Sequence, residues 1–376
     1  MEEMHGRLQG EPLNLLASSE DDWAAIDRAL IRLQASSRAV KECATSEAVP
    51  LTGVAMGLSM PMLTLSTKKE ENGWRVSTGV LHPAVWMVPL PAGQRLEVVR
   101  IPGGLYKVGQ SVHPDCTQVA DGAIPGSDSY ATREVKVESH FLSRYAITHS
   151  QWEAVARLPR VYRHLEVKPW TFERKRSLNL GDWFSREGCN NLPVDSVSWW
   201  DCQEWLARLN IWLGEKWVLH GGKGLAPELT LPSPDLWEIA CRAGSSRAFH
   251  FGDILDPGWA LYRASGSGGV GSPRAGINQK GPLPIGHFGL VNQWGLAEMH
   301  GQLFELCERE GAKISRSGII PGNSVAGWSV NPELISISIC GGSWAAEAHE
   351  CASSYRPTIS SNRRDANVGF RPCCKA

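Results

Sequence analysis

The sequence predicts a loop-rich α+β fold, and three observations support this prediction. The chain of 376 residues contains 16 tryptophans, 38 glycines and 23 prolines, a composition that suits loops pinned by large aromatic side chains. Short alternating segments typical of strands are interrupted by glycine and proline turns. Recognisable N-caps precede a small number of helices, and no fixed-period repeat is present.

Residues 1–94 are expected to form an N-terminal extension of one helix and short strands. Ser19 can cap the helix, and the acidic residues 20–22 lie at its positive end. Segments 74–80 and 85–90 are predicted as strands. The apolar residues that recur with helical spacing, and so share one face of the helix, are Trp23, Ile26, Leu30 and Leu33.

The pattern changes near residue 95, where a second domain, 95–376, is predicted to begin. Residues 96–101 alternate like a strand, and Pro102-Gly103-Gly104 turns the chain into a second strand over 105–109, which predicts a hairpin. Residues 135–141 alternate again. A further short strand is expected at 229–232.

Three more helices are predicted from their caps. They begin near residue 149, over 199–212, and from residue 234, where a proline occupies the first helical position and Gly244 ends the helix. The capping residues are Thr148 with Gln151, Ser198 with Asp201, and Ser233.

Five motifs, taken in order along residues 95–376, resemble the formylglycine-generating-enzyme (sulfatase-modifying-factor) domain, a variant of the C-type lectin fold. The motifs at the C-terminal end carry most of the resemblance: Leu231-Pro-Ser-Pro-Asp-Leu-Trp-Glu238, Gly301-Gln-Leu-Phe-Glu-Leu306, Cys340-Gly-Gly-Ser-Trp344 and Gly369-Phe-Arg371. Within this domain, the segment at about 340–371 is similar to the variable region of the variable proteins of diversity-generating retroelements. The resemblance implies an α+β, C-type-lectin-like fold of the formylglycine-generating-enzyme type. We expect Trp344 and Phe370 to be buried anchors of this domain.

Enzymes of this family bind copper with two cysteines that follow the Gly-Gly-Ser-aromatic motif, and a thiolate pair suits soft Cu(I). The resemblance places these cysteines at Ala346 and Cys351. Alanine cannot ligate a metal, so we expect no catalytic residues and interpret Cys351 as a buried packing residue. His300 and Ser343 are likewise interpreted as structural. The alternatives are a divergent oxidase of the formylglycine-generating type and an inactive structural paralogue.

No cofactor is expected. The family's Gly-Asn-Val-Trp-Glu-Trp segment helps to bind a structural calcium ion, and the corresponding segment here retains Glu305 but has Gln302 in place of asparagine. Glu305 is therefore a weak candidate for a calcium ligand. The ten cysteines are dispersed without Cys-x-x-Cys spacing, which excludes the usual zinc motifs.

In retroelement variable proteins the diversified codons have the form any-any-pyrimidine, which never encodes Glu, Lys, Gln, Met or Trp. Glu347 and Glu350 are thus fixed or differently coded, whereas Arg356 and Arg364 are interpreted as fixed residues that hold the segment. The residues predicted to form a variable, ligand-binding surface are Ala345, Ala346, Ala348, Tyr355, Pro357, Thr358, Ile359, Asp365, Ala366 and Asn367.

The predicted function is recognition of a ligand, expected to be a protein, through this diversified surface. Lysine plus arginine (38) nearly balances aspartate plus glutamate (39), which argues against nucleic-acid binding. No apolar run reaches the ~18 residues of a transmembrane helix, and the N-terminus lacks the layout of a signal peptide. We therefore expect no membrane partner, and a cytoplasmic location or, for a phage-encoded protein, a place on the virion.

Overall fold

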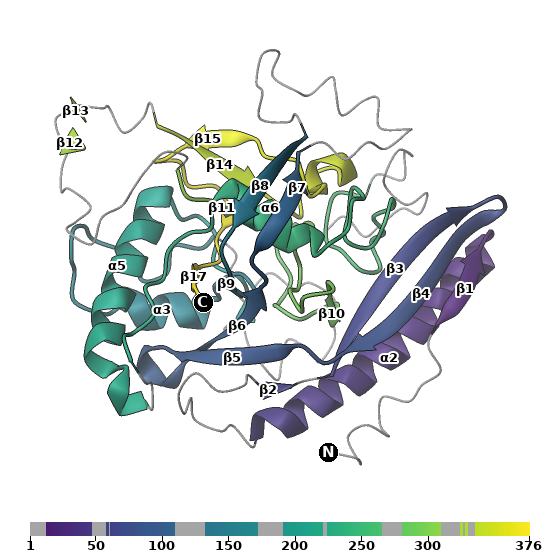
Figure 1. Ribbon diagram of the computed structural model, residues 1–376, viewed down its shortest axis with the longest axis horizontal. Coiled ribbons are helices and arrows are strands. Elements are labelled where there is room, and N and C mark those ends of the chain that lie inside the picture. Colours follow the sequence, from purple (N-terminus) through teal and green to yellow (C-terminus); the bar gives the residue numbers. More distant parts are fainter. Residues whose placement is uncertain are drawn as a thin grey trace.

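The computed structural model describes residues 13–46, 58–59, 61–109, 132–171, 191–220, 224–264, 280–309, 324–325, 328–329 and 335–376, with backbone only at 34–46, 58–59, 324–325 and 328–329 (Figure 1). Residues 265–279, part of a stretch rich in glycine, serine and proline, lie outside these residues, as do Cys116 and Cys189. No helix among the described residues is both long enough and apolar enough to cross a membrane.

The N-terminal part consists of a long helix against a small sheet. Helix α2 (Glu20–Ser46) lies along the hairpin of β3 (Met62–Glu70) and β4 (Gly73–Leu81), and this arm extends from the rest of the molecule in Figure 1. Strand β1 (Asn14–Ala17) pairs with β4, and β10 (Leu290–Val291) pairs in parallel with β3. The predicted apolar face is confirmed at Trp23, Ile26 and Leu30, which are buried.

A five-stranded sheet joins the C-terminal strand to four strands from the first half of the chain. Its order is β17 (Cys373–Lys375), β9 (His140–Ser143), β6 (Arg95–Ile101), β5 (Ala84–Pro89) and β2 (Leu58–Ser59). The 3₁₀ turn η1 (Pro91–Gly93) connects β5 to β6. The C-terminal strand thus pairs with a strand more than 200 residues upstream, which is a long-range contact that no local pattern encodes.

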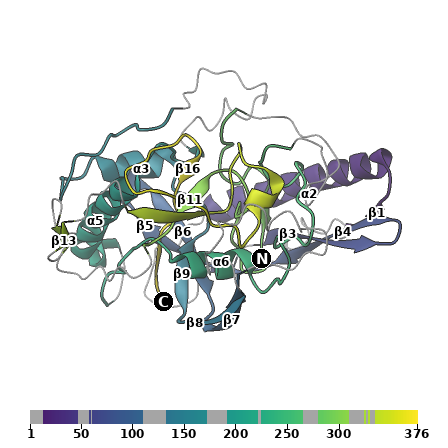
Figure 2. The ribbon, with the colours of Figure 1, turned by 90° about the horizontal axis from the view of Figure 1, so that it is seen from above.

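The predicted hairpin between 96–101 and 105–109 is wrong. Strand β6 is hydrogen-bonded on one side by β5 and on the other by β9, so no edge remains for the following strand. Strand β7 (Gly104–Val108) instead pairs with β8 (Arg133–Val137) in a separate two-stranded ribbon, which lies next to α6 (Pro234–Arg242) in Figure 2. The alternating segment 135–141 is likewise two strands, because the chain passes from β8 to β9 near residue 139.

The predicted helices and their caps are confirmed. Helix α3 (His149–Ala156) has the Thr148–Gln151 capping box, and α5 (Trp199–Lys216) has the Ser198–Asp201 box. Helix α6 has Ser233 as its N-cap and proline at its first position. A 3₁₀ turn, η5 (Val218–His220), follows α5. The strand expected at 229–232 is reduced to an isolated bridge between Thr230 and Cys373.

The C-terminal sheet carries the predicted variable region. Its order is β15 (Thr358–Ser360), β14 (Ser336–Cys340), β11 (Phe304–Leu306) and β16 (Val368–Gly369), and the 3₁₀ turn η7 (Ala348–Cys351) lies between β14 and β15. A small hairpin of β12 (Ser324–Val325) and β13 (Trp328–Ser329) precedes β14 in the chain.

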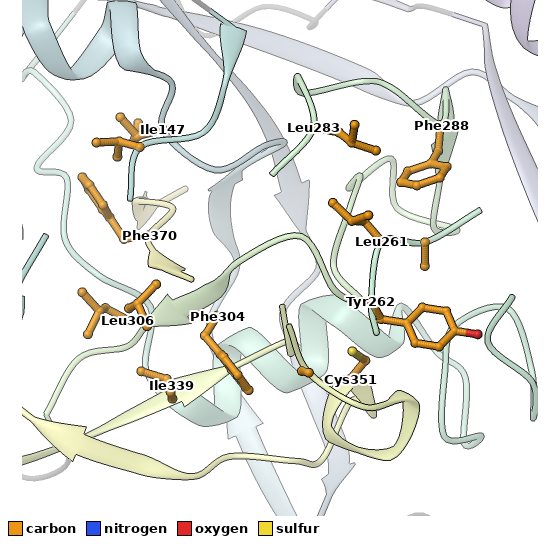
Figure 3. Packing of buried hydrophobic residues seen from close by; sticks show 14 of the residues in the cluster. Ile147, Leu261, Tyr262, Leu283, Phe288, Phe304, Leu306, Ile339, Cys351 and Phe370 are labelled. Atoms are coloured by element: carbon orange, nitrogen blue, oxygen red, sulfur yellow. The ribbon is translucent and has the colours of Figure 1, made fainter. Parts of the chain in front are cut away.

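Aromatic rings connect this sheet to the helices. Phe370 is fully buried, and its ring lies edge-on to Trp152 and Trp205, with centroids 6.1 and 5.4 Å away. Its backbone carbonyl accepts from the Ile147 amide, and Figure 3 shows Phe370 and Ile147 side by side. Phe370 is therefore the buried anchor that the Gly-Phe-Arg motif predicted.

Candidate ligand-binding surface

The predicted variable region starts from a tight turn that only glycine can form. Gly341 and Gly342 have φ values of +96° and +73°. A Cβ atom on Gly342 would lie 2.3 Å from the Cys351 Sγ atom, and one on Gly341 would lie 2.9 Å from the Trp237 ring. The turn thus lets η7 pack directly onto the end of β14.

Ser343 connects the two ends of the region. Its side chain is buried, and its Oγ atom accepts hydrogen bonds from the Ala345 amide (3.3 Å) and the Asn367 side-chain amide (3.3 Å). This confirms its interpretation as a turn hydroxyl, and it brings residues 345 and 367 into one neighbourhood.

A buried ion pair fixes the Gly-Phe-Arg end. The Arg371 guanidinium donates to both Glu305 oxygens, at 2.6 and 2.7 Å, and Trp237 Nε1 donates to the same carboxylate at 2.7 Å. Arg371 also donates to the backbone carbonyls of Ser143 and Arg144. The Glu305 carboxylate, the weak calcium candidate, is thus the counter-ion of a buried arginine.

Eight of the ten predicted variable residues are half-buried or exposed in the structure. Thr358 is exposed, and the half-buried positions are Ala345, Tyr355, Pro357, Ile359, Asp365, Ala366 and Asn367. Ala346 (3% exposed) and Ala348 (9%) belong to the hydrophobic core, so for these two the expectation of solvent-facing side chains is wrong. The Ala346 carbonyl accepts from the Arg263 amide, which holds this residue against the neighbouring loop.

The partly exposed positions are brought together from three separate stretches. Trp344 Nε1 donates to the Ala366 carbonyl at 3.4 Å, which joins the first stretch to the last. The Phe304 amide donates to the Asn367 carbonyl, and the Phe304 ring lies 6.5 Å from the ring of Tyr355. We expected Trp344 to be a buried anchor, but it is half-buried and packs beside this group.

The two glutamates that the codon pattern excludes from variation have structural contacts. Glu347 forms an ion pair with Arg263 at 2.8 Å, and the Glu350 carboxylate accepts from the Glu347 amide at 2.8 Å. Glu350 also accepts a hydrogen bond from the Tyr355 hydroxyl at 3.2 Å. These contacts shape η7 beneath the exposed positions.

Sequence reasoning missed three exposed residues of the region, His349, Asn362 and Arg363. The His349 ring lies 6.2 Å from that of Tyr355, so it extends the same aromatic patch. All three residue types are compatible with any-any-pyrimidine codons, which is the signal that could have included them. We call the exposed and half-buried predicted residues together with His349 the display surface.

Comparison with known proteins identifies the scaffold. Residues 87–376 match the model of the sulfatase-modifying factor enzyme 1-like domain. The chain belongs to this family. The match begins within β5 and runs through β17, and therefore includes both the five-stranded sheet and the display surface.

Several solved structures resemble this family member. Treponema denticola variable protein 1 is 16% identical with a TM-score of 0.50, over 78% of this chain and 100% of that chain. PvdO from Pseudomonas aeruginosa is 17% identical with a TM-score of 0.49, over 77% and 98%. The U1 variant of the major tropism determinant is 12% identical with a TM-score of 0.32, over 86% and 74%. No curated protein matches in sequence. The family match and the first likeness show the predicted α+β, C-type-lectin-like fold.

In this member of the family, the thiol of Cys351 is a packing group. Its side chain is fully buried under Gly342, and burial raises the pKa of the thiol. The partner position is Ala346, which has no thiol. Among the residues that the structure describes, no three histidine, cysteine, aspartate or glutamate side chains are grouped to hold a metal ion.

His300 is held as a neutral ring. Its Nδ1 atom lies 2.7 Å from the Cys351 carbonyl and therefore donates, while Nε2 accepts from the His250 amide at 3.0 Å. Burial lowers its pKa to about 4. With both nitrogens engaged by the backbone, His300 cannot accept the proton of the neighbouring Cys241 thiol, which supports its interpretation as a structural residue.

Proposed function

We propose that this chain is a ligand-binding protein of the sulfatase-modifying-factor-like family that presents the display surface to a protein partner. We further propose that it is a variable protein of a diversity-generating retroelement. The observation that carries the proposal is the division of residues 340–371 into a buried frame and a partly exposed set. The frame is held by Cys351, Phe370 and Arg371, whereas residues at 345, 349, 355, 358 and 365–367 reach solvent. A scaffold whose exposed residues can change independently of its frame is what a diversified binder requires.

The composition of the display surface suits a protein partner. Tyr355 combines a large ring with a hydroxyl group, and it is bordered by His349, Asn367 and the Arg263–Glu347 ion pair. An aromatic centre with a polar rim is typical of protein–protein interfaces, and tyrosine is frequently a hot spot there. The name of Treponema denticola variable protein 1, whose fold this chain shares, gives the proposal further support.

A site-specific crosslinker tests the binding surface. A photoreactive amino acid at exposed Thr358 should capture a specific protein partner, whereas the same group at exposed Leu105 on the β7–β8 ribbon should not. Binding of the captured partner, measured by calorimetry, should then weaken by roughly tenfold or more in Tyr355→Ala, since hot-spot truncations cost about 2 kcal/mol. Equal capture from both positions, or unchanged affinity, would reject the display surface as the binding site.

The genetic part of the proposal has its own test. The coding region for residues 340–371 should have a near-copy beside a reverse-transcriptase gene, with adenines in the copy at the codons of the display surface. Sequencing the neighbouring DNA checks this, and a locus without such a repeat would remove the retroelement from the proposal while leaving ligand binding to be tested.

Copper chemistry provides the contrast. We predict no copper-dependent oxidation of a cysteine-containing peptide. Of the two cysteines that would bind copper, only Cys351 is present, and its sulfur is buried. Oxygen consumption and mass spectrometry of the peptide measure this. Turnover that disappears in Cys351→Ser would instead identify the chain as a divergent oxidase.

A further inference from the structure

Two arginines of the 340–371 segment, the buried Arg356 and the partly exposed Arg364, form ion pairs with carboxylates in the first turns of two helices. Arg364 donates from Nε and Nη2 to the two carboxylate oxygens of Asp201, at 2.7 and 2.9 Å. Arg356 donates to Asp235 at 2.9 Å and lies 3.7 Å from Glu238. Asp201 is in the first turn of α5, and Asp235 is in the first turn of α6.

Both acceptor carboxylates have further partners besides Arg356 and Arg364. Asp201 accepts from the Ser198 amide (2.9 Å) and hydroxyl (2.7 Å) in the capping box of α5, and Arg163 lies 3.7 Å away. Asp235 also accepts from Arg133 at 2.6 Å. Burial disfavours the charge on Asp235, but the hydrogen bonds from Arg133 and Arg356 outweigh this and hold its pKa below the ordinary value. The arginines thus bind to anchors that belong to the scaffold.

The structure assigns Arg356 and Arg364 the role of positioning residues for the display surface. Their ion pairs with Asp235 and Asp201, which we call ties, fix the backbone of the display surface to α6 and α5. The side chains on either side can then change without moving the chain. This inference rests on the proposed function, because a surface that is diversified needs a backbone that stays in place.

The spacing of the ties agrees with where the exposed residues lie. Tyr355 and Pro357 flank the buried Arg356, and Thr358 and Ile359 lie on β15 between the two ties. Asp365, Ala366 and Asn367 follow directly after Arg364. Arg364 uses both prongs of its guanidinium and Arg356 uses one, and each acceptor carboxylate lies in the first turn of a helix. Each ion pair therefore holds the backbone irrespective of which residues occupy the neighbouring positions.

Arg363 provides a matched control. It carries the same charge, it precedes Arg364 directly, and its side chain is 62% exposed. Its ion pair is with Asp365, inside the segment, at 2.6 Å. Arg363→Gln therefore removes the same charge from the same segment without releasing a tie to a helix.

Amide hydrogen exchange measured by mass spectrometry on the full chain tests the assignment. In Arg364→Gln, peptides covering residues 357–367 should exchange roughly two- to fivefold faster, the range that a partly exposed ion pair supplies. Arg363→Gln should match the wild type, and Arg364→Lys, which keeps the charge but not the fork, should lie between. Peptides from α3 and β6 should be unchanged in all three variants.

A double-mutant cycle separates a tie from general destabilisation. Asp201→Asn keeps an oxygen that can accept from Ser198 and so keeps the cap, but it removes the charge and replaces the oxygen that accepts from Arg364 Nη2 by an NH2 group, which breaks the ion pair. It should reproduce the fast exchange of Arg364→Gln, and the double variant should show no further increase. Arg356→Gln should accelerate exchange over 352–357; if the buried site makes that variant unfold, the Arg364 cycle still decides the question.

Exchange in Arg364→Gln that equals the wild type, or that rises equally throughout the molecule, would overturn the assignment. Because these measurements need no ligand, they are independent of the proposed function. Confirmed ties together with a Thr358 crosslinker that captures no partner would uphold the positioning role and reject ligand binding at this surface.

Discussion

Asp195 is a fully buried carboxylate, and one of its oxygens is poorly supported. Its Oδ1 atom accepts from the Ser196 hydroxyl at 2.7 Å and from the Thr171 amide at 3.2 Å. Its Oδ2 atom has no hydrogen-bond partner among the described residues. Burial is the dominant effect and raises the pKa of Asp195 from 3.8 to about 6. The amide of the next residue, Ser196, donates to the Asp365 carbonyl, so Asp195 lies close to the backbone of the display surface.

The raised pKa sets the sign of a pH effect. Between roughly pH 4 and 6 the folded protein keeps the proton that the unfolded chain loses, so the free energy of unfolding falls as the pH rises, and the full cost remains above pH 6. Asp195→Asn removes the charge and should stabilise the protein at pH 7.5 by roughly 1–3 kcal/mol, but much less at pH 4. Urea unfolding at both pH values measures this. Asp21→Asn, at an exposed position, is the control; an equal effect of Asp195→Asn at both pH values would contradict the explanation.

At the scale of elements, the helices show what local sequence can predict. The caps of α3 and α5 were predicted because the interacting residues, such as Ser198 and Asp201, lie within one turn of each other. The wrong hairpin after β6 could not be recognised in this way, because the second edge of β6 is taken by β9, which lies about 40 residues further along the chain. The Pro-Gly-Gly turn is equally compatible with a hairpin and with a change of sheet.

In the candidate surface, too, local motifs predicted some features and long-range packing set the others. Its location was predicted from the Gly-Gly-Ser-Trp and Gly-Phe-Arg motifs, whose buried parts the structure contains at Phe370 and Arg371. The burial of Ala346 and Ala348 was missed because alanine is common in cores and on surfaces alike. The ties of Arg364 and Arg356 to particular carboxylates depend on the placement of α5 and α6, which the segment itself does not encode.

Phe370 and Trp344 should contribute very differently to the stability of the C-terminal sheet. Phe370→Ala removes a fully buried ring that touches two tryptophans and should cost about 3–5 kcal/mol. Trp344→Ala should cost less, on the order of 1–2 kcal/mol, because part of its ring is already in solvent. Chemical denaturation followed by far-UV circular dichroism gives both values. Equal costs would mean that Trp344 is as much a core residue as Phe370.

At the scale of the whole molecule, the N-terminal arm shares its core with the family domain. Trp23 of α2 lies 6.1 Å, between ring centroids, from Trp259, and the Thr67 amide of β3 donates to the Phe251 carbonyl. Strand β10, which comes from the family domain, completes the N-terminal sheet by pairing with β3. The buried side chains of α2 and those around Phe370 belong to one continuous hydrophobic cluster. The arm and the domain are therefore expected to unfold together.

Two isoleucines on the same helix test this expectation. Ile26 is fully buried and Ile31 is 64% exposed. Ile26→Ala should lower the free energy of unfolding by about 2–5 kcal/mol, whereas Ile31→Ala should change it by less than about 0.5 kcal/mol. If the arm and the domain are one cooperative unit, Ile26→Ala should shift the midpoint of unfolding equally for both parts. Helix content reports on the arm, and exchange of the amides around Phe370 reports on the C-terminal sheet. The two should agree because loss of packing in the arm affects the shared cluster. A shift confined to α2, with an unchanged midpoint for the C-terminal sheet, would instead make the arm an independent folding unit.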